Sequence, residues 1–144
     1  MTKRLAVSIG RYPAAVARNL FLVEDELLFA QRLRAAAARL GVPVQALSPT
    51  QARSHAWRRD DVVVLQATLR PEQQLELIDH LRGHEAAPVV IAVTGHLETE
   101  LRQRLKVRGA ILAAHSGMDR VLARALGISD ARADADETRP HPPS

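Results

Sequence analysis

The stretch Asn19-Leu20-Phe21-Leu22-Val23-Glu24-Asp25-Glu26 decides the fold. Four apolar residues run without interruption into three carboxylates, a pattern typical of a strand that is buried on both faces and ends at a charged edge. Such strands belong to parallel sheets, because helices cover both faces of these sheets. In open α/β sheets, ligand sites lie outside the carboxyl ends of the strands. We therefore expect Glu24 and Asp25 to lie at a site on that edge.

The unit of strand and helix that begins there recurs along the chain. An amphipathic helix follows the acidic residues, and Gly41 closes it. Ser48-Pro49-Thr50-Gln51 then carries the hydroxyl, proline and glutamine of a capping-box start. The predicted strands span residues 20–23, 42–47, 61–66, 88–94 and 110–114, and the predicted helices span 27–40, 48–57, 71–83, 97–105 and 118–126.

Five such repeats predict a three-layer α/β/α fold. Helices cover both faces of a doubly wound, five-stranded parallel sheet through right-handed crossovers. The commoner strand order for a small sheet of this kind is 2-1-3-4-5, the flavodoxin-like order. This domain spans residues 19–127. Residues 1–18 are predicted to be a basic N-terminal extension, and residues 128–144, with one large apolar residue and three prolines, a disordered C-terminal tail.

The overall composition excludes several classes of protein. With 144 residues, 47% of them hydrophobic, the chain can bury one sizeable core. The absence of cysteine excludes disulfides and thiolate metal sites. No apolar run approaches the roughly 20 residues that cross a bilayer, and Arg11 interrupts the first apolar segment before it reaches the about 7 to 15 residues of a secretory signal. We therefore expect a cytoplasmic protein without membrane contact.

The charge of the chain is concentrated at its beginning. Twenty basic and sixteen acidic residues give a net charge of +4. All of this excess comes from residues 1–18, and sixteen residues of each sign remain from residue 19 onward. Since the domain is balanced and shows no helix-turn-helix or basic stripe, nucleic acid is disfavoured as a partner. The basic residues of the extension are Lys3, Arg4, Arg11 and Arg18.

Four segments of the domain carry a resemblance to a known family. They are NLFLVEDE at 19–26, DVVVLQ at 61–66, PVVIAVTGH at 88–96 and KVRGAILAAH at 106–115. In this order and at this spacing, the chain resembles the receiver domain of bacterial response regulators, the CheY-like domain of two-component and phosphorelay signal transduction. The resemblance covers roughly residues 19–127, and it implies the same doubly wound sheet.

The resemblance also implies roles for residues at the ends of the strands. In receivers an acidic pair holds Mg²⁺, an aspartate ending the third strand accepts a phosphoryl group from a histidine kinase, a hydroxyl on the fourth strand contacts that group, and a lysine on the fifth pairs with it. Glu24 and Asp25 match the acidic pair, and Thr94 matches the hydroxyl. This sequence departs from the pattern at Gln66, the phosphoacceptor position, and at Ala114, the lysine position.

The substitution at Gln66 decides the expected chemistry. An acyl phosphate forms when a carboxylate oxygen attacks phosphorus, and the oxygen of a primary amide is neutral and delocalised. We therefore expect a pseudo-receiver that is not an enzyme and requires no cofactor. Two arrangements are open for the acidic pair: Glu24 and Asp25 form a weak Mg²⁺ site with one carboxylate fewer than the family has, or Gln66 hydrogen-bonds one carboxylate while solvent covers the other.

Without phosphorylation, the expected function is protein–protein interaction or dimerisation in bacterial two-component signalling, with a kinase, a regulator or a second copy as the partner. Two alternatives remain open. One is a divergent phosphoryl-accepting receiver with an Mg²⁺ site that uses another residue, such as Thr94 or Asp61. The other is a small-ligand-binding or enzymatic doubly wound domain. The surface that receivers use for partners, formed by the fourth helix, fifth strand and fifth helix, carries four basic contact candidates: Arg102, Lys106, Arg120 and Arg124.

Overall fold

The structure, a computed structural model, describes residues 18–23 and 25–128. Most of the predicted N-terminal extension, the predicted C-terminal tail from residue 129 onward, and Glu24 of the acidic pair lie outside the described residues. Within the described part of the chain, no helix combines the length and the apolar character that a membrane span needs.

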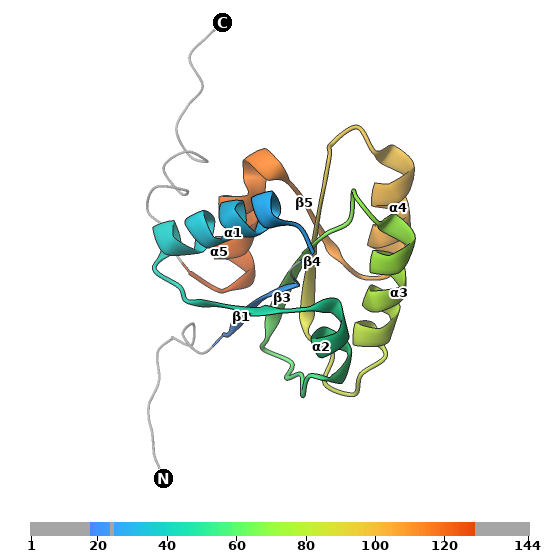
Figure 1. Cartoon of the computed structure of the whole chain (residues 1–144), viewed down its shortest axis with the longest axis horizontal. Helices are drawn as coiled ribbons and strands as arrows, with labels where there is room; N and C mark the ends of the chain where they lie inside the picture. The colour runs from blue at the N-terminus through green and yellow to red at the C-terminus, as the bar shows by residue number, and fades with distance from the viewer. Residues whose placement is uncertain (1–17, 24, 129–144) are drawn as a thin grey trace, which may run out of the picture.

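Strands and helices alternate along the chain (Figure 1). The five strands form one parallel sheet in the order β2-β1-β3-β4-β5, which is the predicted doubly wound fold with the predicted strand order. A short 3₁₀ helix at His115–Gly117 joins the last strand to the last helix. The strands are β1 (Leu20–Val23), β2 (Val44–Leu47), β3 (Val62–Gln66), β4 (Val89–Thr94) and β5 (Ile111–Ala114). The helices are α1 (Leu27–Leu40), α2 (Pro49–Ser54), α3 (Pro71–Arg82), α4 (Thr99–Val107) and α5 (Met118–Ala125).

Two hydrophobic clusters, one on each face of the sheet, hold the layers together. One face is covered by α1 and α5, and the other by α2, α3 and α4 (Figure 1). Along β3, Val62 and Val64 belong to the cluster under α1 and α5, whereas Val63 and Leu65 belong to the opposite cluster. Since both faces of β3 are buried, its sequence carries no polar residue before Gln66.

Local sequence signals set the ends of the helices. The Glu26 carboxylate accepts hydrogen bonds from the N–H groups of Leu28 at 2.8 Å and Phe29 at 3.0 Å, and α1 begins there. Gly41 ends α1 with a φ of +73°, a left-handed conformation that favours glycine. At the start of α2, the N-cap serine and the glutamine three positions later form the predicted capping box. The sequence therefore defines these boundaries directly.

Three elements differ from the prediction by two or more residues at an end. Helix α4 spans Thr99–Val107 rather than residues 97–105, and β2 and α2 differ for local reasons. The second strand begins at Val44 because Pro43 has no N–H to give to the sheet, and the N–H of Val42 bonds instead to the Ala37 carbonyl at 2.9 Å. Helix α2 ends at Ser54, before Trp57. The indole N–H of Trp57 donates to the Ala52 carbonyl at 2.9 Å, so the tryptophan packs against the end of the helix rather than continuing it.

Candidate functional site

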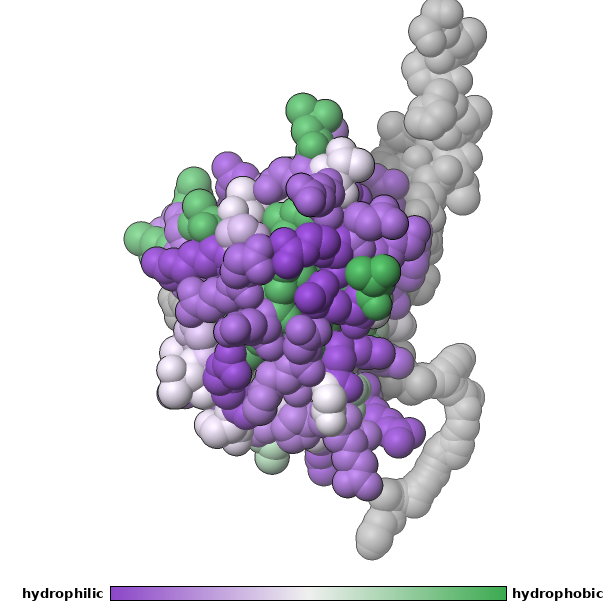
Figure 2. Space-filling model, turned by 90° about the vertical axis from the view of Figure 1, so that its right-hand side faces the viewer, coloured by the Kyte–Doolittle hydropathy of each residue, from purple (hydrophilic) through white to green (hydrophobic). Residues whose placement is uncertain are grey.

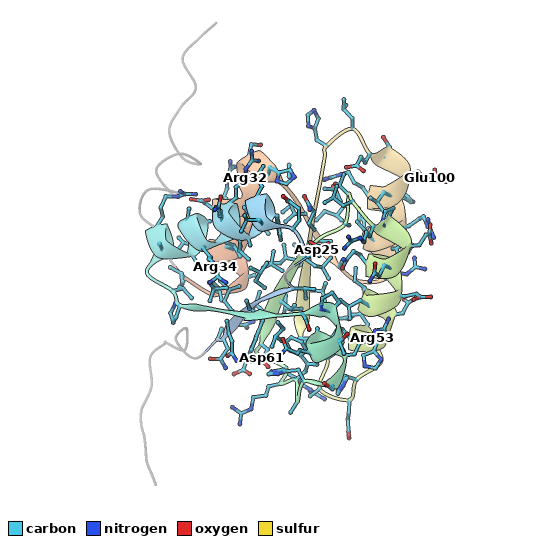
Figure 3. The ribbon with its side chains drawn as sticks, in the orientation of Figure 1. Asp25, Arg32, Arg34, Arg53, Asp61 and Glu100 are labelled. Carbon is cyan, nitrogen blue, oxygen red and sulfur yellow. The ribbon has the colours of Figure 1, made fainter. Side chains whose placement is uncertain are left out.

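The predicted site residues meet at the carboxyl edge of the sheet. Gln66, Thr94 and Ala114 are the last residues of β3, β4 and β5, and Asp25 follows the end of β1. The register pairs Gln66 with Val93 and Thr94 with Ala114, so the ends of the three strands are nearly level. Figure 3 shows Asp25 between α1 on one side and α3 and α4 on the other. The fold thus brings four of the five predicted positions together.

Asp25 is partly buried, and only one of its carboxylate oxygens is hydrogen-bonded. Gln74 of α3 donates from Nε2 to Asp25 Oδ2 at 3.3 Å. The other oxygen, Oδ1, is buried without a hydrogen-bond partner. Burial raises the pKa of Asp25 above its ordinary value of 3.8, and the positive charge of Arg70 opposes this effect. The negative charge of Asp25 is therefore only partly compensated by the protein.

Gln66, at the position that the sequence resemblance matches to the receiver phosphoacceptor, has its amide buried. The residue is 6% exposed, and its Nε2 group makes no hydrogen bond. A buried donor without an acceptor costs about 1 to 3 kcal/mol. Gln66 therefore gives no hydrogen bond to Asp25, and the expected arrangement in which it bonds to Glu24 lies outside the described residues.

Glu26 is a carboxylate near Gln66, and its two oxygens already accept hydrogen bonds from the backbone of α1. The N–H groups of Leu28 and Phe29 lower the pKa of Glu26 below its ordinary value of 4.5. The Gln66 amide contributes a smaller effect in the same direction, without a hydrogen bond of good geometry. Glu26 is thus the N-cap of α1, and its oxygens point to the backbone of that helix.

Thr94 is fully buried, and an arginine holds its hydroxyl. Arg102 of α4 donates from Nη1 to Thr94 Oγ1 at 2.9 Å. The sequence predicts Arg102 as a surface contact residue, but its side chain is half-buried and reaches the end of β4. Sequence reasoning missed this contact because the two residues stand on opposite sides of the loop between β4 and α4. Arg102 therefore belongs to the site.

Glu98 ties two loops of the site together. Its Oε2 accepts the N–H of Gly95 at 2.7 Å and the hydroxyl of Thr68 at 2.8 Å. Thr68 lies between β3 and α3, and Gly95 between β4 and α4. A Cβ atom on Gly95 would lie 3.0 Å from the same oxygen, so glycine permits this close approach. The two loops are therefore joined through one carboxylate.

At the end of β5 lie Ala114, which the sequence resemblance matches to the receiver lysine, and His115. Ala114 is partly buried and lies opposite Thr94 in the register. The Nδ1 atom of His115 is buried without a hydrogen-bond partner, and the ring lies edge-on to Phe29 of α1 with the centroids 6.4 Å apart. His115, rather than a lysine, is thus the polar side chain that β5 brings to this edge.

Asp61, the alternative phosphoacceptor, lies at the opposite edge of the sheet. It precedes the first residue of β3, whereas Gln66 is the last. Its side chain is 1% exposed, and its carboxylate accepts hydrogen bonds from Asn19 Nδ2 at 3.2 Å and from the Arg58 N–H at 2.9 Å. Figure 3 shows Asp61 and Asp25 toward opposite ends of the sheet. Asp61 is therefore separated from Thr94 and Asp25 by the length of the strand.

The oxygen atoms at the carboxyl edge fit a hard cation in part. Among the described residues, no group of three or more His, Cys, Asp or Glu side chains could hold a metal ion. Asp25 and Gln74 each present a buried oxygen, Oδ1 and Oε1, that makes no hydrogen bond. Carboxylate and amide oxygens are ligands that Mg²⁺ and Ca²⁺ accept. The edge therefore offers one carboxylate and one amide, and Glu24 lies outside the described residues.

The remaining contact candidates lie on the outer faces of the last two helices. Lys106 of α4 and Arg120 and Arg124 of α5 are exposed. Two exposed apolar side chains lie in the same region, Val107 at 74% and Ile111 at 42%. Figure 2, which looks onto the side of α3 and α4, shows a mainly hydrophilic face with separate hydrophobic spots. The side of the molecule formed by α3 and α4 is thus polar with a small apolar component.

Comparison by sequence and comparison by structure give different results. No family model matches the chain, and no curated protein matches it. Among solved structures, a response regulator receiver protein from Burkholderia phymatum matches with a TM-score of 0.62 and 20% identity, over 78% of this chain and 97% of its own. The receiver domain of a sensor histidine kinase from Pseudomonas aeruginosa, with a magnesium ion in its active site cleft, matches with a TM-score of 0.62 and 22% identity, over 76% and 97%.

A third solved structure also matches this chain. The signal receiver domain of a modulated diguanylate cyclase from Desulfovibrio desulfuricans has a TM-score of 0.61 and 20% identity, over 82% of this chain and 97% of its own. The sheet order and the layers define a doubly wound α/β protein of the flavodoxin-like class. Within that class, the chain has the fold of CheY-like response regulator receiver domains, as the sequence motifs predicted. At these identities the agreement is one of fold.

Proposed function

We propose that this chain is a pseudo-receiver, a non-enzymatic module of two-component signalling that acts through protein contacts and accepts no phosphoryl group. The observation that carries the proposal is the amide of Gln66 at the end of β3. In phosphoryl transfer to a receiver, an acceptor oxygen bonds to phosphorus while the bond to the donor breaks. A neutral amide oxygen is a poor nucleophile for this step.

Other oxygens near the edge are poor substitutes for the missing carboxylate. Thr94 is fully buried and its hydroxyl is held by Arg102. The oxygens of Glu26 cap α1, and Glu98 Oε2 is occupied by two hydrogen bonds. Asp61 lies at the opposite edge. These contacts favour a protein that is not phosphorylated over a divergent phosphoryl acceptor.

The contacts of Thr94 also support a module that keeps one arrangement. In receivers the corresponding hydroxyl contacts the phosphoryl group, whereas here Arg102 holds it at 2.9 Å. A hydroxyl already held by α4 needs no phosphoryl group to fix its position. We therefore propose that the region between β4 and α4 presents a constant surface to its partner.

The proposed partner is another protein, either a kinase or regulator of the same signalling system or a second copy of this chain. The proposed contact surface consists of α4, β5 and α5. It offers the basic side chains of Lys106, Arg120 and Arg124 beside the apolar side chains of Val107 and Ile111. Such a mixture of cationic and apolar groups suits a partner surface with acidic and apolar residues.

The phosphorylation part of the proposal is tested by intact mass. The full chain is incubated with Mg²⁺ and acetyl phosphate and then weighed, and we expect it to remain unmodified. The matched control is the double variant Gln66→Asp with Ala114→Lys, which restores both receiver groups and should gain one phosphoryl group. A stoichiometric adduct on the unaltered chain would contradict the proposal.

The contact surface is tested by charge reversal. The double variant Lys106→Glu with Arg120→Glu should lose binding that the unaltered protein shows. Affinity capture measures the loss of a different protein partner, and light scattering measures the loss of a second copy of the chain. Arg58→Glu with Arg59→Glu, which reverses two exposed charges in the turn before β3, serves as the control. Equal losses in both variants would show that the effect is one of net charge rather than of this surface.

A further inference from the structure

The buried polar atoms without partners gather at one edge of the molecule. Three of their residues follow or end the strands β1, β3 and β5, and the fourth reaches Asp25 from α3. Buried polar groups in folded proteins are normally paired. Their concentration at this edge points to a ligand. Among the described residues these atoms are Asp25 Oδ1, Gln66 Nε2, Gln74 Oε1 and His115 Nδ1.

Gln74 is the residue whose burial most needs an explanation. It is 1% exposed and lies on the face of α3 that also buries Ile78 and Leu81. An apolar residue there would bury no unpaired amide oxygen, although Asp25 Oδ2 would lose its donor. The hydrogen bond from Nε2 to Asp25 Oδ2 fixes the orientation of the amide, because the reversed amide would place oxygen against oxygen. Oε1 is therefore left as an acceptor with no donor.

Two unpartnered oxygens thus belong to side chains that already contact each other, Asp25 and Gln74. Carboxylate and amide carbonyl oxygens are ligands of hard divalent cations. We propose that Gln74 Oε1 and Asp25 together bind a divalent cation, with the amide oxygen from α3 replacing the carboxylate that receivers carry on the third strand. The inference rests on the proposed function in one respect, namely that position 66 supplies no carboxylate.

The other atoms of the edge are consistent with this division of roles. The unpartnered atom of Gln66 is Nε2, a donor, which cannot ligate a cation. A bound cation ties α3 to the end of β1. The cation is then an effector that acts on this edge without phosphorylation.

Calorimetric titration of the full chain with Mg²⁺ and with Mn²⁺ tests the inference. Gln74→Met keeps the size of the side chain and removes its oxygen, so we expect the affinity for both ions to fall about 5-fold or more. Asp25→Asn removes the charged ligand and should lower the affinity about 10-fold or more. Gln74→Glu adds a charged ligand and should raise the affinity about 10-fold. Gln73→Met changes the exposed neighbour on the same helix and should leave binding unchanged.

A change of metal preference separates a ligand from a residue that only orients Asp25. Gln74→His replaces an oxygen donor by a nitrogen donor and should shift the preference from Mg²⁺ toward Zn²⁺.

Melting curves without metal show whether each variant folds. If Gln74→Met does not fold, Gln74→Glu and Gln74→His test the inference in its place. The inference is overturned if the unaltered chain binds neither Mg²⁺ nor Mn²⁺, if Gln74→Met binds them equally well, or if Gln74→His keeps the original preference. An unmodified mass with no cation binding overturns only this inference, whereas a phosphoryl adduct overturns the proposed function.

Discussion

The two edges of the sheet each hold an acid, which is buried at one edge and partly buried at the other, and the two acids differ in how their oxygens are paired. At the amino edge, Asp61 is 1% exposed and its carboxylate accepts hydrogen bonds from Asn19 and Arg58. At the carboxyl edge, Asp25 has one oxygen bonded to Gln74 and the other without a partner. Burial of a carboxylate therefore does not mark a site by itself. Incomplete pairing does, because a purely structural group gains nothing from being left unpaired.

The largest effect should come from removing the acid of the amino edge. Asp61→Ala leaves Asn19 Nδ2 and the Arg58 N–H without an acceptor, so we expect the free energy of unfolding to fall by about 3 kcal/mol. Urea denaturation followed through the fluorescence of Trp57, the single tryptophan, measures this change.

The matched variant at the other edge is Asp25→Ala. It removes a carboxylate with one unpaired oxygen but also leaves Gln74 Nε2 without its acceptor, so the free energy of unfolding should fall by only about 1 kcal/mol. Equal losses in the two variants would show that the edges do not differ in the way the hydrogen bonds indicate.

A gain in stability is expected at Gln66. Gln66→Leu removes the buried Nε2 donor that has no partner, and the free energy of unfolding should rise by about 1.5 kcal/mol. Gln45→Leu, at an exposed position of β2, serves as the control and should stay within about 0.5 kcal/mol of the unaltered chain. A loss of stability at Gln66 would indicate that its amide is satisfied in solution.

A smaller loss is expected when the hydroxyl of Thr94 is released. Arg102→Ala removes the hydrogen bond to Thr94 and should lower the free energy of unfolding by about 1 kcal/mol. Arg104→Ala on the same helix breaks an exposed ion pair with Glu72, and its loss should be smaller because solvent screens that pair. Chemical denaturation of both variants decides whether the Thr94 contact is worth more than the surface pair.

The smallest effect is one of pH dependence. Burial raises the pKa of Asp25 above 3.8, so the folded state binds its proton more tightly than the unfolded state does. The stabilisation from Asp25 is complete below pH 3.8 and is lost as the pH rises through the raised pKa. Relative to Asp25→Asn, the unaltered chain should therefore lose stability on going from acid to neutral pH in the absence of divalent cations.

Glu26 provides the opposite case for the same measurement. Its pKa is lowered below 4.5 by the backbone N–H groups at the start of α1, so its contribution is present above that pH and is lost as the pH falls through the lowered pKa. Relative to Glu26→Gln, the unaltered chain should gain stability as the pH rises. The same slope for both pairs would contradict the assigned environments of the two carboxylates.

The sequence predicted the sheet because a strand buried on both faces has a continuous apolar pattern. The runs that became β1, β3 and β4 end at Val23, Gln66 and Thr94, and parallel pairing carries these ends to one edge. The position of Gln66 and Thr94 therefore followed from pattern alone. The apolar run predicts a strand from Val42, whereas β2 begins at Val44, because Pro43 has no N–H to give to the sheet.

The partners of those residues could not be predicted in the same way. Arg102 reaches Thr94 across a loop whose path depends on the packing of α4. Gln74 did leave a signal: it stands four residues before Ile78, on the apolar stripe of α3, and a polar residue on a buried stripe is the informative exception. The pattern shows that such a residue is buried, but only the folded chain shows that Asp25 is beside it.

The carboxylate of Glu98 has a mechanical consequence. One oxygen of Glu98 accepts hydrogen bonds from the backbone after β4 and from the hydroxyl of Thr68. The loops that follow β3 and β4 are therefore linked and move as one unit. A partner that displaces one of them must move the other as well or break the hydrogen bond between Thr68 and Glu98. A displacement of α4 is in this way transmitted to the loop that follows Gln66, and no diffusible ligand is needed.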